Sequence, residues 1–348
     1  MKKILRSVAS LYITLICLSL LMILVFACTI SQAKIGIYYA VQYYITSWVV
    51  KINGIPVFPG GLLVNSILFI NLIAGHIVHF KKKFSQFGIW MIHLGVFLLI
   101  LGSAITYFQG IESQMLIDVG EKKFYSQDFK KAELVLIDHS ELKNDTVYAI
   151  DEDQLLKKTI KNSILPVKIQ VLESYLNAFV KEDQLIPLPV SKQDNQQNFF
   201  SAKIKIEDSS GNGGIYVLST MQEAAENVTI NGKPFSIQLR PKRFYYPFSL
   251  TLKKFVHEKY LGTEIPKKYA SILTLEEGDQ KRDVSILMNQ PLRYKGYTFF
   301  QASFGKGDQM TILQVVKNPA WTLPYWSSLI MALGMLIHFG YRIYQRKK

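Results

Sequence analysis

Cysteine is nearly missing from this chain, which holds two cysteines in 348 residues. Both of them, Cys17 and Cys28, lie inside the first long apolar stretch, and no Cys-x-x-Cys motif occurs. A disulfide framework, thiol redox chemistry and a thiolate metal site are therefore not expected. The sequence also lacks a Ser-His-Asp order, a zinc motif and paired acid–base carboxylates, so it gives no sign of a catalytic centre of its own.

Acidic residues are missing from both ends of the chain. All 26 of them lie between Glu112 and Asp308. Twelve of the 40 Lys and Arg residues lie outside residues 112–317, so that segment holds 28 basic and 26 acidic residues and is nearly neutral. The net charge of +14 therefore does not predict a nucleic-acid-binding surface, because the excess lies beside apolar windows.

Charge of either sign is absent from four windows, residues 7–33, 52–80, 84–111 and 318–341. Each window exceeds the length of about 20 residues that spans a bilayer. The first is longer than the apolar core of about 7 to 15 residues in a signal peptide, so we interpret it as a retained anchor. We predict four transmembrane helices, which are Val8–Ile30, Leu62–Phe80, a third that carries His93 outward to Phe108, and Leu323–Tyr341.

The segment Ile35–Val50 is uncharged and rich in aromatic residues, which predicts a helix at the outer membrane interface. A re-entrant piece or the top of a longer helix are the alternatives. Asn53-Gly54 and the Pro and Gly residues after it predict a break in the chain before the second helix.

The basic residues predict the orientation. Ten of the twelve that flank the windows fall on one side if the N-terminus is cytoplasmic, and only Lys34 and Lys51 fall on the other. The positive-inside rule then predicts a multi-pass protein of the inner (plasma) membrane with both termini in the cytoplasm and the large domain periplasmic or otherwise extracytoplasmic.

Residues 112–317 have the pattern of an all-β domain. Apolar residues alternate with polar ones in segments such as Ala202–Glu207, as in a half-buried strand. We predict separate strands at Phe235–Arg240 and Phe248–Phe255, with one helical interlude at Asp151–Ile160. His139 and His257 lack neighbours at metal-ligand spacing and are predicted to be ordinary surface histidines.

The predicted fold is therefore a membrane protein with four transmembrane helices and a large all-β sandwich or open barrel inserted between helices three and four. The predicted domains are residues 1–111, 112–317 and 318–348.

His93 is the most informative residue. It lies ten residues after Lys83, or about 15 Å at roughly 1.5 Å per residue, near the midplane of a hydrocarbon core of about 30 Å. An ionisable group at that depth normally faces a partner or a cavity. Gly88, Gly95 and Gly102 recur every seven residues and predict a helix-packing face about 160° away from His93 around the axis. The alternative is a histidine that only bonds a neighbouring helix.

Three further histidines lie in the inner half of the predicted membrane region. His76 and His79 are close to the end of the second helix, and His338 is four residues before Arg342. Their clustering would suit a ligand taken up from the cytoplasm, although unrelated interfacial side chains are an alternative.

Four stretches carry a resemblance to a known family. They are Trp90–Gly95, Gly110–Met115 with Gly120-Glu121, the block from Phe248 through Glu264-Ile-Pro266 to Thr274, and Asn289–Phe304. The last has the pattern Asn-x-Pro-Leu-x-Tyr-x-Gly-Tyr-x-Phe-x-Gln-Ala-Ser and is the most specific. With the four-helix layout, they resemble the ResB family, also called CcsB, of the system II cytochrome c biogenesis machinery.

This resemblance implies a role in moving haem across the membrane for covalent attachment to apocytochrome c. In the family, the histidine of the third helix is a proposed axial haem ligand, and His93 is the matching position. The implied cofactor is haem b, transported or transiently bound. His76, His79 and His338 are not carried over by the resemblance and are predicted as haem-binding residues only from their depth.

The resemblance also implies a partner, the CcsA or ResC subunit with its tryptophan-rich loop. This chain has four tryptophans, Trp48, Trp90, Trp321 and Trp326, and they form no such loop. We therefore expect a non-catalytic subunit of a haem-lyase complex, and at this length not a tandem fusion of both subunits. The alternatives are a membrane-anchored β-domain scaffold or assembly factor without direct haem binding, and a transporter unrelated to haem, which the lack of broken-helix signals disfavours.

Overall fold

The computed structural model describes residues 2–79, 84–141, 145–160, 165–193, 196–208, 210–211, 213–222, 224–262 and 266–346. Phe80, the predicted end of the second membrane helix, and Glu264 in one family-like stretch lie outside these residues. The chain divides into two compact units. The helical unit comprises Met1–Gly110, Lys192–Asn195 and Asn318–Lys348, and the β unit comprises Ile111–Ser191 and Gln196–Lys317.

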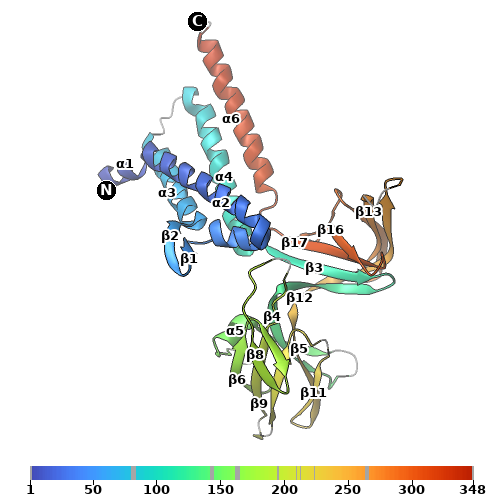
Figure 1. Cartoon of the computed structure of the whole chain (residues 1–348). Coiled ribbons are helices and arrows are strands. Elements are labelled where there is room, and N and C mark those ends of the chain that lie inside the picture. The colour runs from blue at the N-terminus through green and yellow to red at the C-terminus, as the bar shows by residue number, and fades with distance from the viewer. Residues whose placement is uncertain are drawn as a thin grey trace. The chain divides into compact units, whose positions relative to one another are not determined.

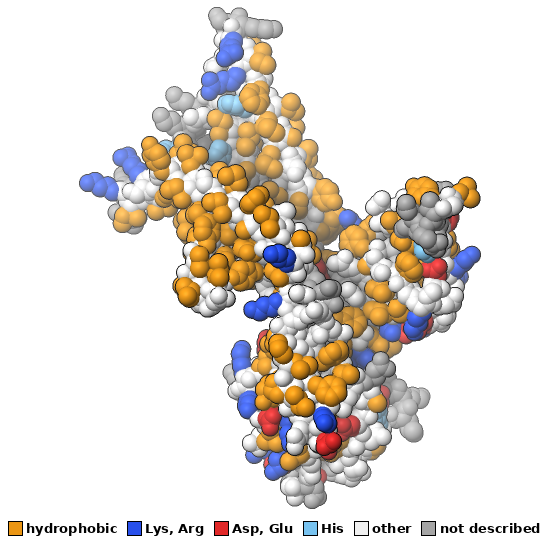
Figure 2. All heavy atoms as spheres, viewed as in Figure 1, with side chains coloured by type: hydrophobic (Ala, Val, Ile, Leu, Met, Phe, Trp, Pro, Cys, Tyr) orange, Lys and Arg blue, Asp and Glu red, His pale blue; other side chains and the backbone are white. Residues whose placement is uncertain are grey.

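In its described residues, the helical unit contains four helices that are long and apolar enough to cross a membrane. They are α2 (Leu11–Tyr44), α3 (Gly61–His79), α4 (Phe87–Gln109) and α6 (Leu323–Arg346). A short helix α1 (Lys2–Val8) precedes α2, and a 3₁₀ turn η1 (Phe84–Gln86) precedes α4. On the face shown in Figure 2, hydrophobic side chains cover most of these helices, whereas basic side chains lie on α1 and at the end of α6. The prediction of a multi-pass membrane protein with four spans is confirmed.

The region after the first predicted helix differs from expectation. Helix α2 continues past Ile30 and is interrupted at Gly36, whose φ of 79° and ψ of 167° lie in a region that only glycine enters at low cost. The helix then resumes to Tyr44, and Val49 begins a strand, so Ile35–Val50 is not a single interfacial helix.

The predicted chain break before the second membrane helix is a β-hairpin. Strands β1 (Val49–Ile52) and β2 (Ile55–Pro59) are antiparallel. The two turn residues between them have positive φ, 51° at Asn53 and 83° at Gly54. An Asn-Gly pair suits a tight hairpin turn for this reason.

The glycine face of α4 packs against α6, as the seven-residue spacing predicts. A Cβ added at Gly88 would lie 2.5 Å from the backbone oxygen of Gly334, and one at Gly95 would lie 2.4 Å from Cγ of Met331. At Gly102 the nearest atom would be Cβ of Leu323, 3.0 Å away. Close approach of two backbones through small residues is a typical way for membrane helices to associate.

A buried asparagine ties α3 to the junction between α1 and α2. The side-chain amide of Asn71 donates to the carbonyl oxygens of Val8, at 2.6 Å, and Ser10, at 3.0 Å. Its Oδ1 accepts a hydrogen bond of 2.6 Å from the hydroxyl of Thr14. The N-terminal helix is interrupted at these residues. The Asn71 amide supplies their carbonyl oxygens with hydrogen bonds that water could not supply in a membrane interior.

The β unit has two halves that share two long strands, β4 (Lys122–Asp138) and β12 (Lys233–Lys259). The two strands pair antiparallel, and the register is irregular between Tyr245 and Leu250. The sheet that contains these strands contributes side chains to two separate hydrophobic cores. Figure 1 shows both strands where the two halves meet.

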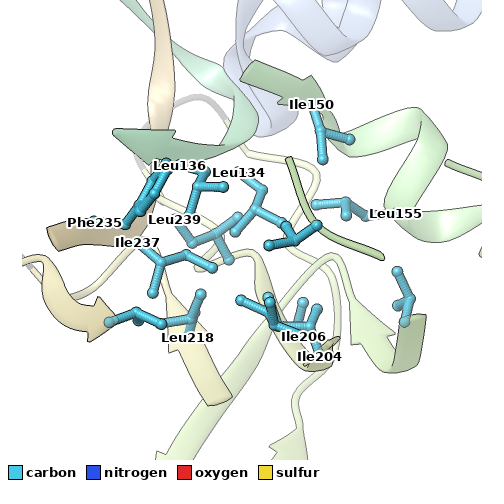
Figure 3. Packing of buried hydrophobic residues seen from close by; sticks show 14 of the residues in the cluster. Leu134, Leu136, Ile150, Leu155, Ile204, Ile206, Leu218, Phe235, Ile237 and Leu239 are labelled. Atoms are coloured by element: carbon cyan, nitrogen blue, oxygen red, sulfur yellow. The ribbon is translucent and has the colours of Figure 1, made fainter. Parts of the chain in front are cut away.

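The first half of the β unit is a sandwich. One layer consists of β5 (Thr146–Asp151), β4, β12 and β11 (Glu226–Ile230). The other layer is a three-stranded sheet of β6 (Lys168–Tyr175), β9 (Ser201–Glu207) and β10 (Gly213–Ser219). Alternate apolar side chains of both sheets form a common core, shown in Figure 3. Helix α5 (Glu152–Leu156), which lies in the predicted interlude, contributes Leu155 to it. A further hairpin pairs β7 (Ala178–Lys181) with β8 (Gln184–Pro187).

The second half is a nearly closed antiparallel barrel. Its strands follow the order β14 (Gln280–Leu287), β13 (Pro266–Glu277), β12, β4, β3 (Ile111–Asp118), β17 (Met310–Lys317), β16 (Tyr297–Gly305) and β15 (Leu292–Tyr294). A bridge between Leu287 and Gln290 brings the two ends of this order together. A second apolar core, with Phe299 fully buried, fills the interior. The all-β prediction is confirmed.

One of the two histidines predicted to be on the surface of this unit is only slightly exposed. The side chain of His257 is 10% exposed, and its Nδ1 lies 3.1 Å from Oδ1 of Asp308. The prediction was wrong because this carboxylate is distant in sequence and approaches only through strand pairing. His139 is more exposed and lies between Asp145 and Ser236.

Candidate functional site

His93 lies on the face of α4 opposite the glycines that pack against α6. Its side chain is exposed in the described structure, and its Nδ1 lies 2.8 Å from the carbonyl oxygen of Ile89, one turn earlier in the helix. A carbonyl oxygen only accepts hydrogen bonds, so Nδ1 carries the proton in this contact. The lone pair is then on Nε2, which is the tautomer that can bind a metal through Nε2.

A groove between α3 and α4 contains the imidazole of His93. Its volume is about 210 Å³, and the residues that line it are Leu72, Ile73, His76, Ile77, Trp90, His93, Leu94 and Phe97. Pockets that enclose a drug-sized ligand have volumes of roughly 300 to 1,000 Å³. The groove can therefore contact part of a large flat ligand but cannot enclose one.

The walls of the groove combine two imidazoles with aromatic rings. The ring of His76 lies 5.9 Å from that of Trp90, with 45° between their planes. Phe87 stacks on Trp90 at 6.2 Å, and Phe69 stacks on Phe97 at 5.0 Å. These contacts hold the aromatic side chains next to the imidazoles in an apolar surface, an arrangement suited to a ligand that is both flat and metal-containing.

The other two membrane histidines lie elsewhere. Nε2 of His79 is 3.3 Å from the carbonyl oxygen of Ala9, between α1 and α2, and His79 does not line the groove. His338 lies at the α4–α6 contact, where its backbone nitrogen would be 2.6 Å from a Cβ at Gly88. Its Nδ1 is buried without a hydrogen-bond partner among the described residues. The structure thus brings His76 and His93 together and separates them from His79 and His338.

Sequence reasoning did not identify the aromatic walls of the groove. Trp90, His93 and Phe97 are three and four residues apart, and Leu72 and Ile73 precede His76 by the same steps. This spacing places each set on one face of its helix. The signal was present in the sequence, but only the packing of α3 on α4 shows that the two faces meet.

No group of three or more His, Cys, Asp or Glu side chains with metal-site geometry occurs in the part of the chain that the structure describes. A metal bound in the groove would therefore have to bring ligands of its own, as the iron of a porphyrin does.

Comparisons with known proteins agree on one relationship. The model of the ResB-like family matches residues 74–312, which include α4 and most of the β unit. Protein NrfI of Wolinella succinogenes is 25% identical over 275 residues, which cover 78% of this chain. The matched part is 29% of that protein's length, so the chain corresponds to less than a third of its relative.

Proposed function

The chain belongs to the ResB-like family, and from this premise we propose that it is the haem-handling membrane subunit of a system II cytochrome c synthase. Family membership implies a role in system II cytochrome c biogenesis. Its specific task would be to help deliver haem across the membrane for covalent attachment to apocytochrome c. Haem is then a cargo, held transiently, and not a resident cofactor.

The observation that carries this proposal is the state of the His93 imidazole. The ring lies beside an apolar, aromatic groove, its Nδ1 is bonded to the Ile89 carbonyl, and its Nε2 is the ring nitrogen that remains to bind iron. A histidine imidazole is a common axial haem ligand, and a hydrogen bond from its other nitrogen fixes the ring and increases its basicity. We assign His93 as an axial ligand and Trp90 and Phe97 as side chains that contact the macrocycle.

His76 has a second place in this proposal. It lines the same groove from α3 and is held against Trp90. We propose that it contacts the same cargo from the edge of the groove. His79 and His338 are not assigned to haem binding, because their surroundings are the α1–α2 junction and the α4–α6 contact.

The small volume of the groove supports a requirement for a second membrane subunit. About 210 Å³ leaves most of a haem outside this chain, so the opposite face of the haem and its second axial ligand need a partner. A CcsA- or ResC-like subunit with a tryptophan-rich loop is the partner that family membership suggests.

The orientation is part of the same proposal. By the positive-inside rule, the flanking basic residues support an orientation with both termini in the cytoplasm and the β unit on the outer side of the plasma membrane. Haem taken up at the inner face would then be released on the side where the β unit lies. The β unit would there meet apocytochrome c or the partner subunit.

The proposal is tested by purifying the chain together with its partner and recording the visible spectrum of His93→Ala and His79→Ala. Loss of the Soret band of ligated haem in His93→Ala, with loss of cytochrome c maturation in cells, is expected. His79→Ala is the matched control, because it removes an imidazole outside the groove. A Soret band unchanged in His93→Ala would refute the assignment of His93, and normal cytochrome c maturation without this chain would refute the function.

A further inference from the structure

An exposed aromatic cluster lies on the β unit where β4 and β12 pair. The ring centroids of Phe124, Tyr125 and Tyr245 are 5.6 to 6.0 Å from one another. Phe124 is 49% exposed and Tyr245 is 47% exposed. Large aromatic side chains gathered on a surface usually mark a place of contact with another molecule. We refer to these three residues as the aromatic face.

A guanidinium group lies on the aromatic face. The Cζ atom of Arg243 is 4.4 Å from the ring centroid of Tyr125. In the β4–β12 register, Tyr245 is opposite Tyr125 and Arg243 is opposite Gln127, so these side chains share one side of the strand pair. The pairing becomes irregular next to Tyr245, and there the ring of Phe124 lies 6.0 Å from that of Tyr245. The face therefore combines apolar rings with a positive charge.

Arg243 differs from its basic neighbours on β12 in having no anionic partner among the described residues. Arg240 is paired with Glu133, and Lys242 is paired with Asp151. Arg243 makes no ion pair with any residue that the structure describes, and its Nε is buried without a hydrogen-bond partner. A buried donor without a partner is uncommon in folded proteins. A carboxylate brought by a ligand would give this guanidinium the ion pair that no described residue supplies.

We infer that the aromatic face with Arg243 binds a flat aromatic ligand that carries carboxylates. Rings of such a ligand can stack on Phe124 and Tyr245, and its carboxylate can pair with the guanidinium. The identification of that ligand as a porphyrin rests on the proposed function, which supplies haem to this side of the membrane. The face would hold haem after it leaves the groove between α3 and α4.

Binding at this face does not depend on iron. The described histidines of the β unit, His139 and His257, are bonded to Asp145 and Asp308 and do not belong to the aromatic face. An extended polypeptide is a less suitable occupant, because β4 and β12 are interior strands of their sheet here and offer no free edge for an added strand.

The test uses the full-length chain in lipid nanodiscs, titrated with iron-free protoporphyrin IX, with empty nanodiscs as the blank. We expect Phe124→Ala to bind the porphyrin about two- to tenfold more weakly, the range of one aromatic contact. Arg243→Gln should weaken binding of the free acid about tenfold and leave binding of the dimethyl ester unchanged. Phe300→Ala is the matched control, because Phe300 is a 36% exposed phenylalanine of the same unit outside the face.

Equal binding by Phe124→Ala and Phe300→Ala, or no binding above that of empty nanodiscs, would overturn the inference. Binding of an apocytochrome peptide at the aromatic face, without binding of porphyrin there, would also overturn it. Phe124→Leu, which keeps an apolar side chain, replaces Phe124→Ala if the latter does not fold, and thermal melts of all variants check this. Because iron-free porphyrin has no metal for His93 to bind, the result does not depend on the assignment of His93 as an axial ligand.

Discussion

The contact between α4 and α6 predicts that one added methyl group, in Gly88→Ala, lowers the stability of the helical unit. A Cβ at Gly88 would lie 2.5 Å from the backbone oxygen of Gly334 and 2.6 Å from the backbone nitrogen of His338. Backbone atoms of two packed helices cannot move aside separately, so Gly88→Ala must push the helices apart. Overpacking of this kind costs about 1 to 3 kcal/mol, and we expect the upper end of that range.

Two other glycines of the same helices should show smaller costs of a Gly→Ala substitution. A Cβ at Gly102 would first meet the side chain of Leu323 at 3.0 Å, which can adjust, so Gly102→Ala should cost less than Gly88→Ala. Nothing lies within 4 Å of a Cβ at Gly340. Gly340→Ala should therefore be neutral, or stabilising by up to about 1 kcal/mol through helix propensity.

Thermal unfolding of the purified chain in detergent, followed by the loss of monodisperse protein on size exclusion, measures this series. The expected order of stability is Gly340→Ala above Gly102→Ala above Gly88→Ala. A Gly88→Ala protein as stable as Gly340→Ala would refute the reasoning, because it would mean that the two backbones do not meet at Gly88.

Two predictions concern the β unit. The side chains of Glu133 and Arg240 are only 5% and 4% exposed, so Glu133→Ala leaves a buried guanidinium without its carboxylate and should cost about 3 to 5 kcal/mol in urea unfolding. Asp283→Ala, which breaks an exposed ion pair with Lys253, should change the urea midpoint little, and equal effects of the two variants would contradict this account. Burial raises the pKa of the Asp128 carboxyl in the folded chain, in spite of opposing contributions from a backbone hydrogen bond and nearby lysines. The proton is then bound more tightly in the folded state, so this contribution to stability is complete below the unfolded pKa and is lost as pH rises through the folded pKa. Asp128→Asn should therefore raise the melting temperature at pH 7, with the gain disappearing in melts below about pH 4; a gain independent of pH would refute the assignment to this carboxyl.

The membrane helices could be predicted because their signal is local. Long apolar windows without charge give the four spans, and the spacing of Gly88, Gly95 and Gly102 gives the face of α4 that packs on α6. The break at Gly36 and the β1–β2 hairpin were missed. Apolar content alone does not distinguish a continuous helix from one that ends at a glycine, and the Asn53-Gly54 turn was interpreted only as a break.

In the β unit, by contrast, the extent of a strand depends on residues that are distant in the sequence. Strand β12 was predicted as two strands, Phe235–Arg240 and Phe248–Phe255, and Pro241 and Pro247 lie between them. The structure has one strand, Lys233–Lys259, with irregular pairing around these positions. Its continuity depends on β4, which is more than a hundred residues earlier in the chain and whose register no local pattern specifies.

Part of the candidate site could be predicted from local sequence, and part depends on the packing of the helices. The direction of His93 away from the glycine face follows from helical geometry alone. That His76 joins it in one groove, while His338 lies at the contact of α4 with α6, depends on which helices are neighbours and how each is rotated. Depth in the membrane placed all four histidines together, but depth carries no information on direction around the helix.

Rescue by free imidazole tests most directly whether His93 binds haem iron. His93→Gly leaves space where the ring lies, and added imidazole can occupy that space as a detached ligand. For the chain purified with its partner, we predict that His93→Gly loses the spectrum of axially ligated haem and that imidazole restores it, whereas it restores nothing in His93→Leu, which fills the space. A ligated spectrum in His93→Gly without imidazole would contradict the central claim.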